Sequence, residues 1–100
     1  MQPNGIKFQF VSTIWKYQGP ASWYFVSMPE KMLGKIRRQL QFQEEGWGRM
    51  KCKAKIGKTE WESAIWFDTK RKAYLLPLKA EIRKKEKLED GTKTKVIVWI

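Results

Sequence analysis

Two segments decide the fold: residues 23–38, WYFVSMPEKMLGKIRR, and residues 74–85, YLLPLKAEIRKK. In each, an apolar run typical of a β-strand meets a proline, and a basic stretch with helical spacing and an isoleucine–arginine pair follows. We expect a helix to open at Pro29 and another at Pro77. A pattern that occurs twice in 100 residues predicts one domain over residues 1–100, with similar halves at about 6–48 and 49–100.

The clearest single strand is predicted over residues 49–56, RMKCKAKI, where apolar and cationic residues alternate strictly. The apolar set is Met50, Cys52, Ala54 and Ile56. The cationic set is Arg49, Lys51, Lys53 and Lys55. Because side chains alternate between the two faces of a strand, we expect the apolar set in the core and the lysines exposed.

Five further apolar runs predict strands at residues 6–17, 22–27, 59–67, 73–76 and 95–100. With the two helices, the predicted order is β-β-α-β-β-β-α-β, a mainly β domain with two short helices. Within the first strand the alternation slips by one residue at Val11, which predicts a bulge or a change of face. Ser27 and Glu30 have the spacing of a capping box at the start of the first helix.

The charge of the chain is strongly positive, with 21 Lys and Arg against 10 Asp and Glu and a net charge of +11. Such a surface attracts polyanions, but the same charge also keeps a small aromatic-rich protein in solution, and both interpretations remain open. The single cysteine, Cys52, excludes an intrachain disulfide and favours the cytoplasm. We expect no secretory signal and no membrane span, because the apolar runs are far shorter than about 20 residues.

Residues suited to catalysis are scarce. The chain has no histidine, a single cysteine and no glycine-rich phosphate loop, which removes the commonest general base and metal ligands. Glu60 and Glu62 share a strand face about 7 Å apart, and opposing lysines explain that pair better than acid–base chemistry does. We therefore expect a binding module without catalysis, cofactor or metal.

Four motifs together resemble one family: Ile14-Trp15, Trp23-Tyr24-Phe25-Val26-x-x-Pro29, Ile56-Gly57 followed by Trp61-x-Ser63, and Tyr74-x-Leu76-Pro77-x-Lys79-Ala80-x-Ile82-Arg83-Lys84. This combination, spread over nearly the whole chain, is similar to the bacterial domain of unknown function 1905. The resemblance implies a single-chain double-split β-barrel with helix-capped ends, related in fold to the AbrB and MazE half-barrels. The family has no settled activity, so the resemblance implies a fold and gives only a hint of nucleic-acid binding.

The first functional hypothesis is weakly selective nucleic-acid binding by regularly placed cations. A strand with a cation at every second residue spaces its charges about 6.8 Å apart, close to the phosphate spacing of an extended strand. The candidate contacts are Arg37, Arg38, Arg49, Lys51, Lys53, Lys55, Arg83, Lys84 and Lys85. The alternative is that edge-strand lysines only discourage sheet-to-sheet aggregation.

The second hypothesis is a barrel that binds a small molecule or a protein partner. Six tryptophans in 100 residues could line a pocket between the halves, or they could simply fill a short core. Tryptophans beside the strand cations would favour nucleic acid, whereas tryptophans around a closed cavity would favour a ligand. We expect a monomer or weak dimer and no membrane binding, because neither helix has the bulky apolar face of an interfacial helix.

Overall fold

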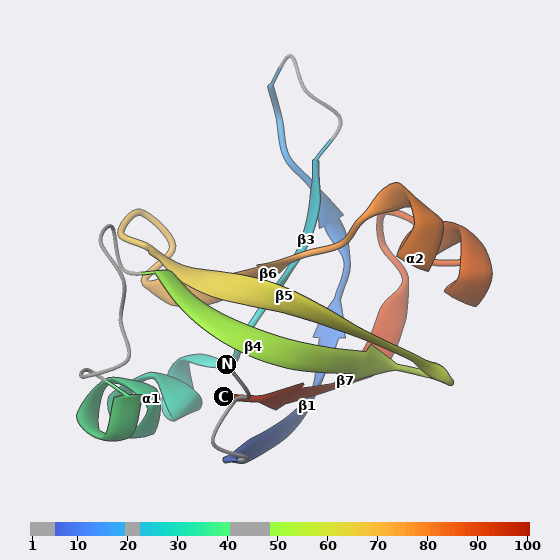
Figure 1. Ribbon diagram of the computed structural model, residues 1–100. Helices are drawn as coiled ribbons and strands as arrows, with labels where there is room; N and C mark the ends of the chain where they lie inside the picture. Colours follow the sequence, from blue (N-terminus) through green and yellow to red (C-terminus); the bar gives the residue numbers. More distant parts are fainter. Residues whose placement is uncertain (1–5, 20–22, 41–48) are drawn as a thin grey trace.

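The computed structural model describes residues 6–19, 23–40 and 49–100, in which seven strands form one antiparallel sheet (Figure 1). The strands are β1 (Lys7–Thr13), β2 (Trp15–Lys16), β3 (Tyr24–Ser27), β4 (Arg49–Ile56), β5 (Thr59–Asp68), β6 (Ala73–Pro77) and β7 (Lys93–Trp99). The helical elements are the 3-10 turn η1 (Glu30–Met32), α1 (Leu33–Leu40) and α2 (Ala80–Glu86). The mainly β fold with two short helices is confirmed, and the element order matches once the first predicted strand is divided.

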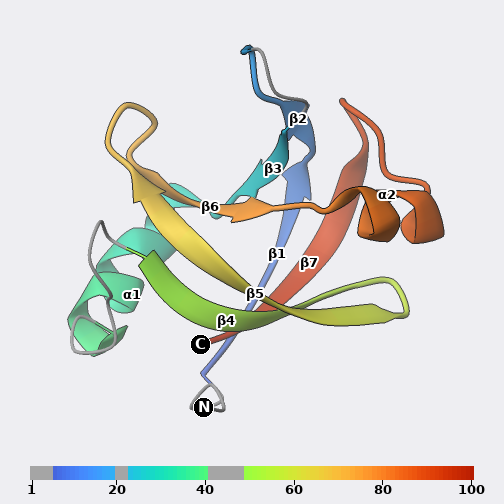
Figure 2. The same cartoon turned by 45° about the horizontal axis from the view of Figure 1, so that its top comes forward.

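The sheet is curled, and its strand order explains why (Figure 2). The order is β1-β7-β4-β5-β6-β3-β2, so β1 and β2 lie at opposite ends of the sheet although Ile14 alone separates them in sequence. The two ends can meet only if the sheet bends round. Where they meet, the Ser12 hydroxyl of β1 donates a hydrogen bond to the Ser27 carbonyl of β3 at 3.0 Å.

The corner at Ile14 is held by the turn that precedes β7. The Ile14 N–H donates to the Thr92 carbonyl at 2.8 Å, and its own carbonyl accepts from the Gly91 N–H at 2.7 Å. The predicted bulge at Val11 is wrong, because β1 pairs with β7 without interruption from Lys7 to Thr13. The chain changes partner at Ile14 instead, where a fully buried side chain and two backbone hydrogen bonds fix the bend.

The pairing of β1 with β7 continues one residue beyond the strands. Ile6 and Ile100 exchange two backbone hydrogen bonds, with N–H to carbonyl distances of 3.2 and 2.9 Å. The two described ends of the chain therefore lie side by side at the same end of an antiparallel pair.

The core lies on the concave side of the sheet and contains the predicted apolar set of β4. Met50, Cys52, Ala54 and Ile56 are each at most 2% exposed, which confirms the predicted register of that strand. The segments around the helices add buried apolar side chains to the same cluster: Ile36 from α1, Ile82 from α2, and Leu78 and Leu88 on either side of α2.

The first helical segment begins after Pro29 as predicted, but the predicted capping box and the start of the second helix need correction. Ser27 lies in β3 and its hydroxyl accepts a hydrogen bond from Trp15 Nε1 at 2.9 Å, so it does not cap the helix; η1 begins after Pro29 without a side-chain cap. Pro77 is the last residue of β6, opposite Phe25, and α2 begins at Ala80. Proline is tolerated at such a strand end because it cannot donate a ladder hydrogen bond.

The end of α2 is fastened to the hairpin between β4 and β5. The Glu86 carboxylate accepts hydrogen bonds from the Thr59 hydroxyl at 2.6 Å and from the Lys58 N–H at 3.3 Å. Gly57, at φ +60°, lies against the same carboxylate, where a Cβ would collide with it. The hairpin therefore needs glycine there both for its turn and for the close approach of Glu86.

Candidate functional site

The four cations of β4 share its outer face, opposite the core, but their exposure differs. Arg49 and Lys51 are exposed as expected, whereas Lys53 and Lys55 are half-buried. The reason is that β4 is an interior strand at that point: Lys53 lies opposite Trp99 of β7, and Lys55 lies opposite Ile97. The interpretation of these lysines as edge-strand protection is therefore wrong for Lys53 and Lys55.

Acidic residues on β5 balance the inner half of this row of cations. Lys53 forms an ion pair with Glu60 at 2.9 Å and lies opposite Glu62, while Lys55 lies opposite Glu60. The hydrogen bond and the charge of Lys53 lower the pKa of Glu60 below its ordinary value. Glu60 thus serves as the partner of Lys53, as the sequence predicted, and Glu62 lies opposite the same lysine.

The outer half of the row has a different neighbourhood. Arg49 lies opposite Trp66 and Lys51 lies opposite Ala64 across the β4–β5 pair. These two exposed cations, called here the Arg49–Lys51 end, therefore lie opposite an aromatic ring and a small side chain.

The helix cations lie apart from this strand. Figures 1 and 2 place α1, with Arg37 and Arg38, and α2, with Arg83, Lys84 and Lys85, at opposite ends of the sheet. Arg37 stacks on Phe67 at 4.9 Å and Arg83 on Tyr24 at 3.8 Å, measured from the guanidinium carbon to the ring centroid. The predicted contacts therefore lie in three groups, on β4, α1 and α2.

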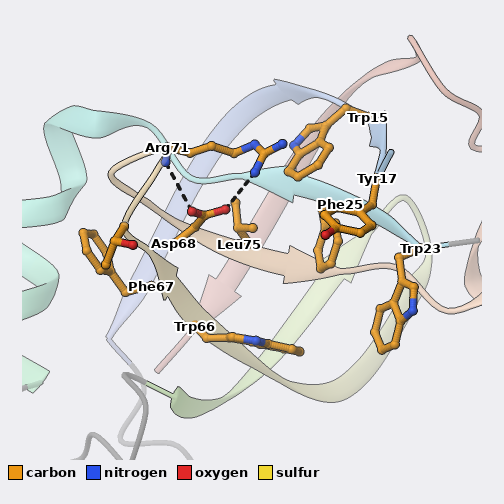
Figure 3. Close-up of a pocket in the computed structure, with 10 residues that line it drawn as sticks. Trp15, Tyr17, Trp23, Phe25, Trp66, Phe67, Asp68, Arg71 and Leu75 are labelled. Carbon is orange, nitrogen blue, oxygen red and sulfur yellow. Dashed lines mark hydrogen bonds and ion pairs between the residues drawn. The ribbon is translucent and has the colours of Figure 1, made fainter. Parts of the chain in front are cut away.

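An open pocket lies on the outside of β2, β3, β5 and β6, where segments of the two predicted halves adjoin (Figure 3). Its volume is about 460 Å³. We call it the aromatic pocket, and its apolar lining is Trp15, Tyr17, Trp23, Phe25, Trp66, Phe67 and Leu75. Leu75 lies between Trp66 on one side and Trp15 with Phe25 on the other. Its wall is completed by Asp68, at the end of β5, and by Thr69 and Arg71 from the loop that follows.

The rings of the aromatic pocket form a connected set. Phe25 is the central member, with Trp15 at 5.1 Å, Trp23 at 6.0 Å and Tyr17 at 6.5 Å between ring centroids. Trp23 is nearly parallel to Phe25, at 10°, yet 48% of it is exposed, and Tyr17 is 43% exposed. Large exposed rings of this kind are typical of binding surfaces.

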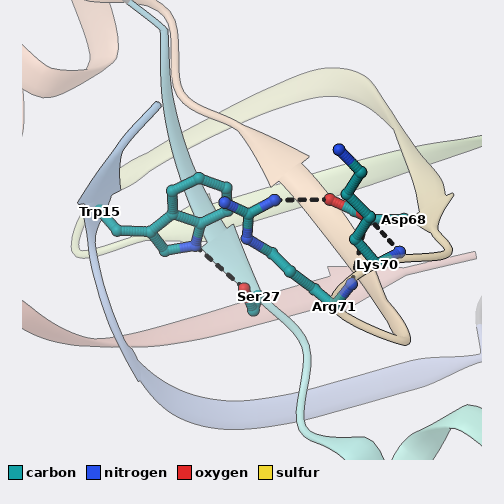
Figure 4. A network of polar contacts seen from close by, with 5 residues as sticks. All are labelled: Trp15, Ser27, Asp68, Lys70 and Arg71. Atoms are coloured by element: carbon teal, nitrogen blue, oxygen red, sulfur yellow. Dashed lines mark hydrogen bonds and ion pairs between the residues drawn. The ribbon is translucent and has the colours of Figure 1, made fainter. Parts of the chain in front are cut away.

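Trp15 is held in place by a polar network (Figure 4). Its indole N–H donates to Ser27, and the guanidinium of Arg71 covers its ring at 4.2 Å. Asp68 fixes Arg71 by an ion pair at 2.8 Å. Burial opposes ionisation of Asp68, but hydrogen bonds from Arg71 and from the backbone of Lys70 outweigh it, so the pKa of Asp68 lies below its ordinary value.

A second pocket adjoins the aromatic pocket and shares Trp66 with it. Its volume is about 350 Å³, and its lining includes the cations Arg49, Lys51 and Lys79 together with Glu62 and Pro77. The pairing of the strands shows the continuity: Arg49 lies opposite Trp66, and Trp66 lies opposite Leu75 on β6. The Arg49–Lys51 end and the aromatic pocket are therefore parts of one continuous surface.

The tryptophans are divided between this surface and the core. Trp15, Trp23 and Trp66 line the aromatic pocket, Trp66 and Trp99 border the cations of β4, and Trp61 packs against the core. Trp47 lies outside the described residues. The pocket is open to solvent rather than a closed cavity.

Other kinds of site find little support in the described part of the chain. Within residues 6–19, 23–40 and 49–100, no three acidic or cysteine side chains gather as a metal site would require. Burial raises the pKa of the Cys52 thiol to about 12. None of the described helices has the length and apolar character needed to cross a bilayer.

Comparison with known protein families identifies the family of this chain. Residues 10–98 match the family described as Domain of unknown function (DUF1905). The protein belongs to this family, as the four sequence motifs indicated. No curated protein matches the chain.

Proposed function

We propose that this protein binds nucleic acid on the outer surface of β4, β5 and β6. The observation that supports this most strongly is the junction at Trp66, where the Arg49–Lys51 end meets the aromatic pocket. Proteins that bind single strands combine a basic track for the phosphates with aromatic rings for the bases. The net charge of +11 would draw any polyanion toward this surface.

Phosphate contacts are assigned to Arg49, Lys51 and Lys79, three exposed cations in the lining of the second pocket. Lys53 and Lys55 contribute less, because both are half-buried and the Glu60 carboxylate, which pairs with Lys53 and lies opposite Lys55, offsets their charge. The cations of the two helices lie at opposite ends of the sheet, and we assign them to the general positive field.

The test is a titration of fluorescently labelled oligonucleotide at several salt concentrations. Three phosphate contacts predict a slope of about −2 for log affinity against log salt on a single strand. The double variant Arg49→Gln/Lys51→Gln should make that slope shallower by about 1.4. The matched control is Lys53→Gln/Lys55→Gln, which removes the same charge from the same strand and should change the slope less.

Two outcomes would contradict the proposal. Equal effects of the two double variants would mean that only net charge matters and that the Arg49–Lys51 end is not a site. Absence of binding to any oligonucleotide at low salt would exclude nucleic acid altogether.

A second candidate is a small planar ligand. The volume of the aromatic pocket, 460 Å³, lies within the range of about 300–1,000 Å³ typical of small-molecule sites. A ligand of this kind would bind independently of salt and of Arg49, so the same titration separates the two candidates.

A further inference from the structure

We infer that the aromatic pocket stacks unpaired nucleobases, so that the protein selects single-stranded over double-stranded nucleic acid. This inference rests on the proposed function and adds to it the form of nucleic acid that is bound.

The stacking surface is the exposed end of the aromatic set. Trp23 lies parallel to Phe25, which supports one side of the indole, while nearly half of Trp23 remains in contact with solvent. Tyr17 meets Phe25 edge-on and is similarly exposed. Covering these rings with a flat heteroaromatic base removes apolar surface from water and requires no sequence-specific hydrogen bond.

The walls of the pocket are fixed before a ligand arrives. Ser27 orients the Trp15 indole, and the pair Asp68–Arg71 holds a guanidinium flat against it. Trp66 is anchored in the middle of the sheet, between Arg49 on β4 and Leu75 on β6. A rigid pocket loses little conformational entropy on binding, which favours affinity.

The placement of charge selects the occupant. The cations that can meet phosphates lie beyond Trp66, at Arg49 and Lys51, whereas Arg71 beside Trp15 is paired with Asp68. A single strand can put its bases on the rings and its phosphates near these cations. A duplex would keep its bases paired and bring its phosphates against the rings, which offer them no hydrogen bonds. Neutral sugars and proline-rich peptides could stack but would gain nothing from the cations.

The experiment compares three ligands of about ten nucleotides with equal sugar-phosphate chemistry. They are a single strand, an abasic strand without bases, and a hairpin duplex, each titrated while tryptophan fluorescence is followed. The single strand should bind about 5- to 150-fold more tightly than the abasic strand and should quench the fluorescence. The hairpin should bind more weakly than the single strand.

The variant Trp23→Ala should lose this preference, and Trp23→Phe should restore most of it. Because Trp23 is exposed, neither change should disturb the fold, which circular dichroism can verify. Trp99→Phe is the control, since Trp99 lies beyond the β4 cations and outside the aromatic pocket. It should leave the preference unchanged.

The outcomes separate the two proposals. Equal affinity for the abasic strand and the single strand would overturn the stacking inference but leave the proposed function standing. Failure of all three ligands to bind would overturn the proposed function itself. Binding of free adenosine monophosphate as tight as that of the strand, abolished by Trp23→Ala, would replace the strand by a free nucleotide as the occupant.

Discussion

Two glycines show how the backbone conformation of a residue decides whether substitution by alanine stabilises or destabilises the fold. Gly91 has φ +92° with open space around its Cα, so a side chain there meets no neighbour but forces an unfavourable backbone conformation. Gly34 lies in α1 with ordinary helical φ, and an added Cβ would contact only the end of Arg38 at 3.9 Å. The same substitution should therefore have opposite effects at the two positions.

We expect Gly91→Ala to lower the free energy of unfolding by about 1–2 kcal/mol, because the turn at Gly91 also supports the corner at Ile14. We expect Gly34→Ala to raise it by about 0.5–1 kcal/mol. Urea unfolding followed by tryptophan fluorescence measures both. A stabilised Gly91→Ala variant would contradict the left-handed conformation assigned to this turn.

At the scale of elements, the end of β5 at Asp68 and the loop that follows it form a wall of the aromatic pocket. Because the pKa of Asp68 is lowered in the folded state, the contribution of its contacts to stability is complete above the ordinary aspartate pKa of about 3.9. That contribution is lost as pH falls through the lower, folded-state pKa. Protonation would then release Arg71 from Asp68.

This predicts a change in tryptophan fluorescence below about pH 4, as Arg71 leaves the ring of Trp15. Asp68→Asn should show the changed spectrum already at neutral pH and lack this acid transition. Persistence of the transition in Asp68→Asn would assign it to another carboxyl group.

Elements with a strong local pattern could be predicted from the sequence. The alternation in residues 49–56 fixed both the strand and its buried face, because a strand of period two leaves a single choice of core side. The break at Ile14 could not be predicted in the same way. It depends on hydrogen bonds to Gly91 and Thr92, nearly 80 residues away, and alternation carries no information about such partners.

The candidate site was predicted less well than the fold, for a similar reason. The β4 cations were found from their spacing, but their unequal exposure depends on the neighbouring strands. The aromatic pocket joins Trp15 and Phe25 to Trp66 and Arg71, which belong to different parts of the chain. The excess of tryptophan in the composition was the only signal for it, and composition cannot place a ring.

At the scale of the whole molecule, Cys52 reports on cooperative opening. It is 2% exposed in the middle of β4, and burial raises the pKa of its thiol to about 12, so a thiol reagent should react only after the core opens. We expect slow labelling of the native protein. In Gly91→Ala the labelling rate should rise about 5- to 30-fold, in proportion to the loss of stability.

Urea unfolding of the same two proteins is the control, because it gives the loss of stability with which the labelling rates are compared. Labelling that is fast in both proteins, or that is unchanged by Gly91→Ala, would mean that β4 opens locally without the rest of the sheet.

The pairing of Ile6 with Ile100 has a mechanical consequence. A pulling force applied at these two residues acts at one end of the antiparallel pair of β1 and β7, across the strands and along their hydrogen bonds. The load then falls on one pair of residues at a time, so the two strands separate pair by pair at low force. A force applied between Ile6 and Lys93 would instead act along the strands, and all pairs from Lys7–Trp99 to Thr13–Lys93 would resist it together.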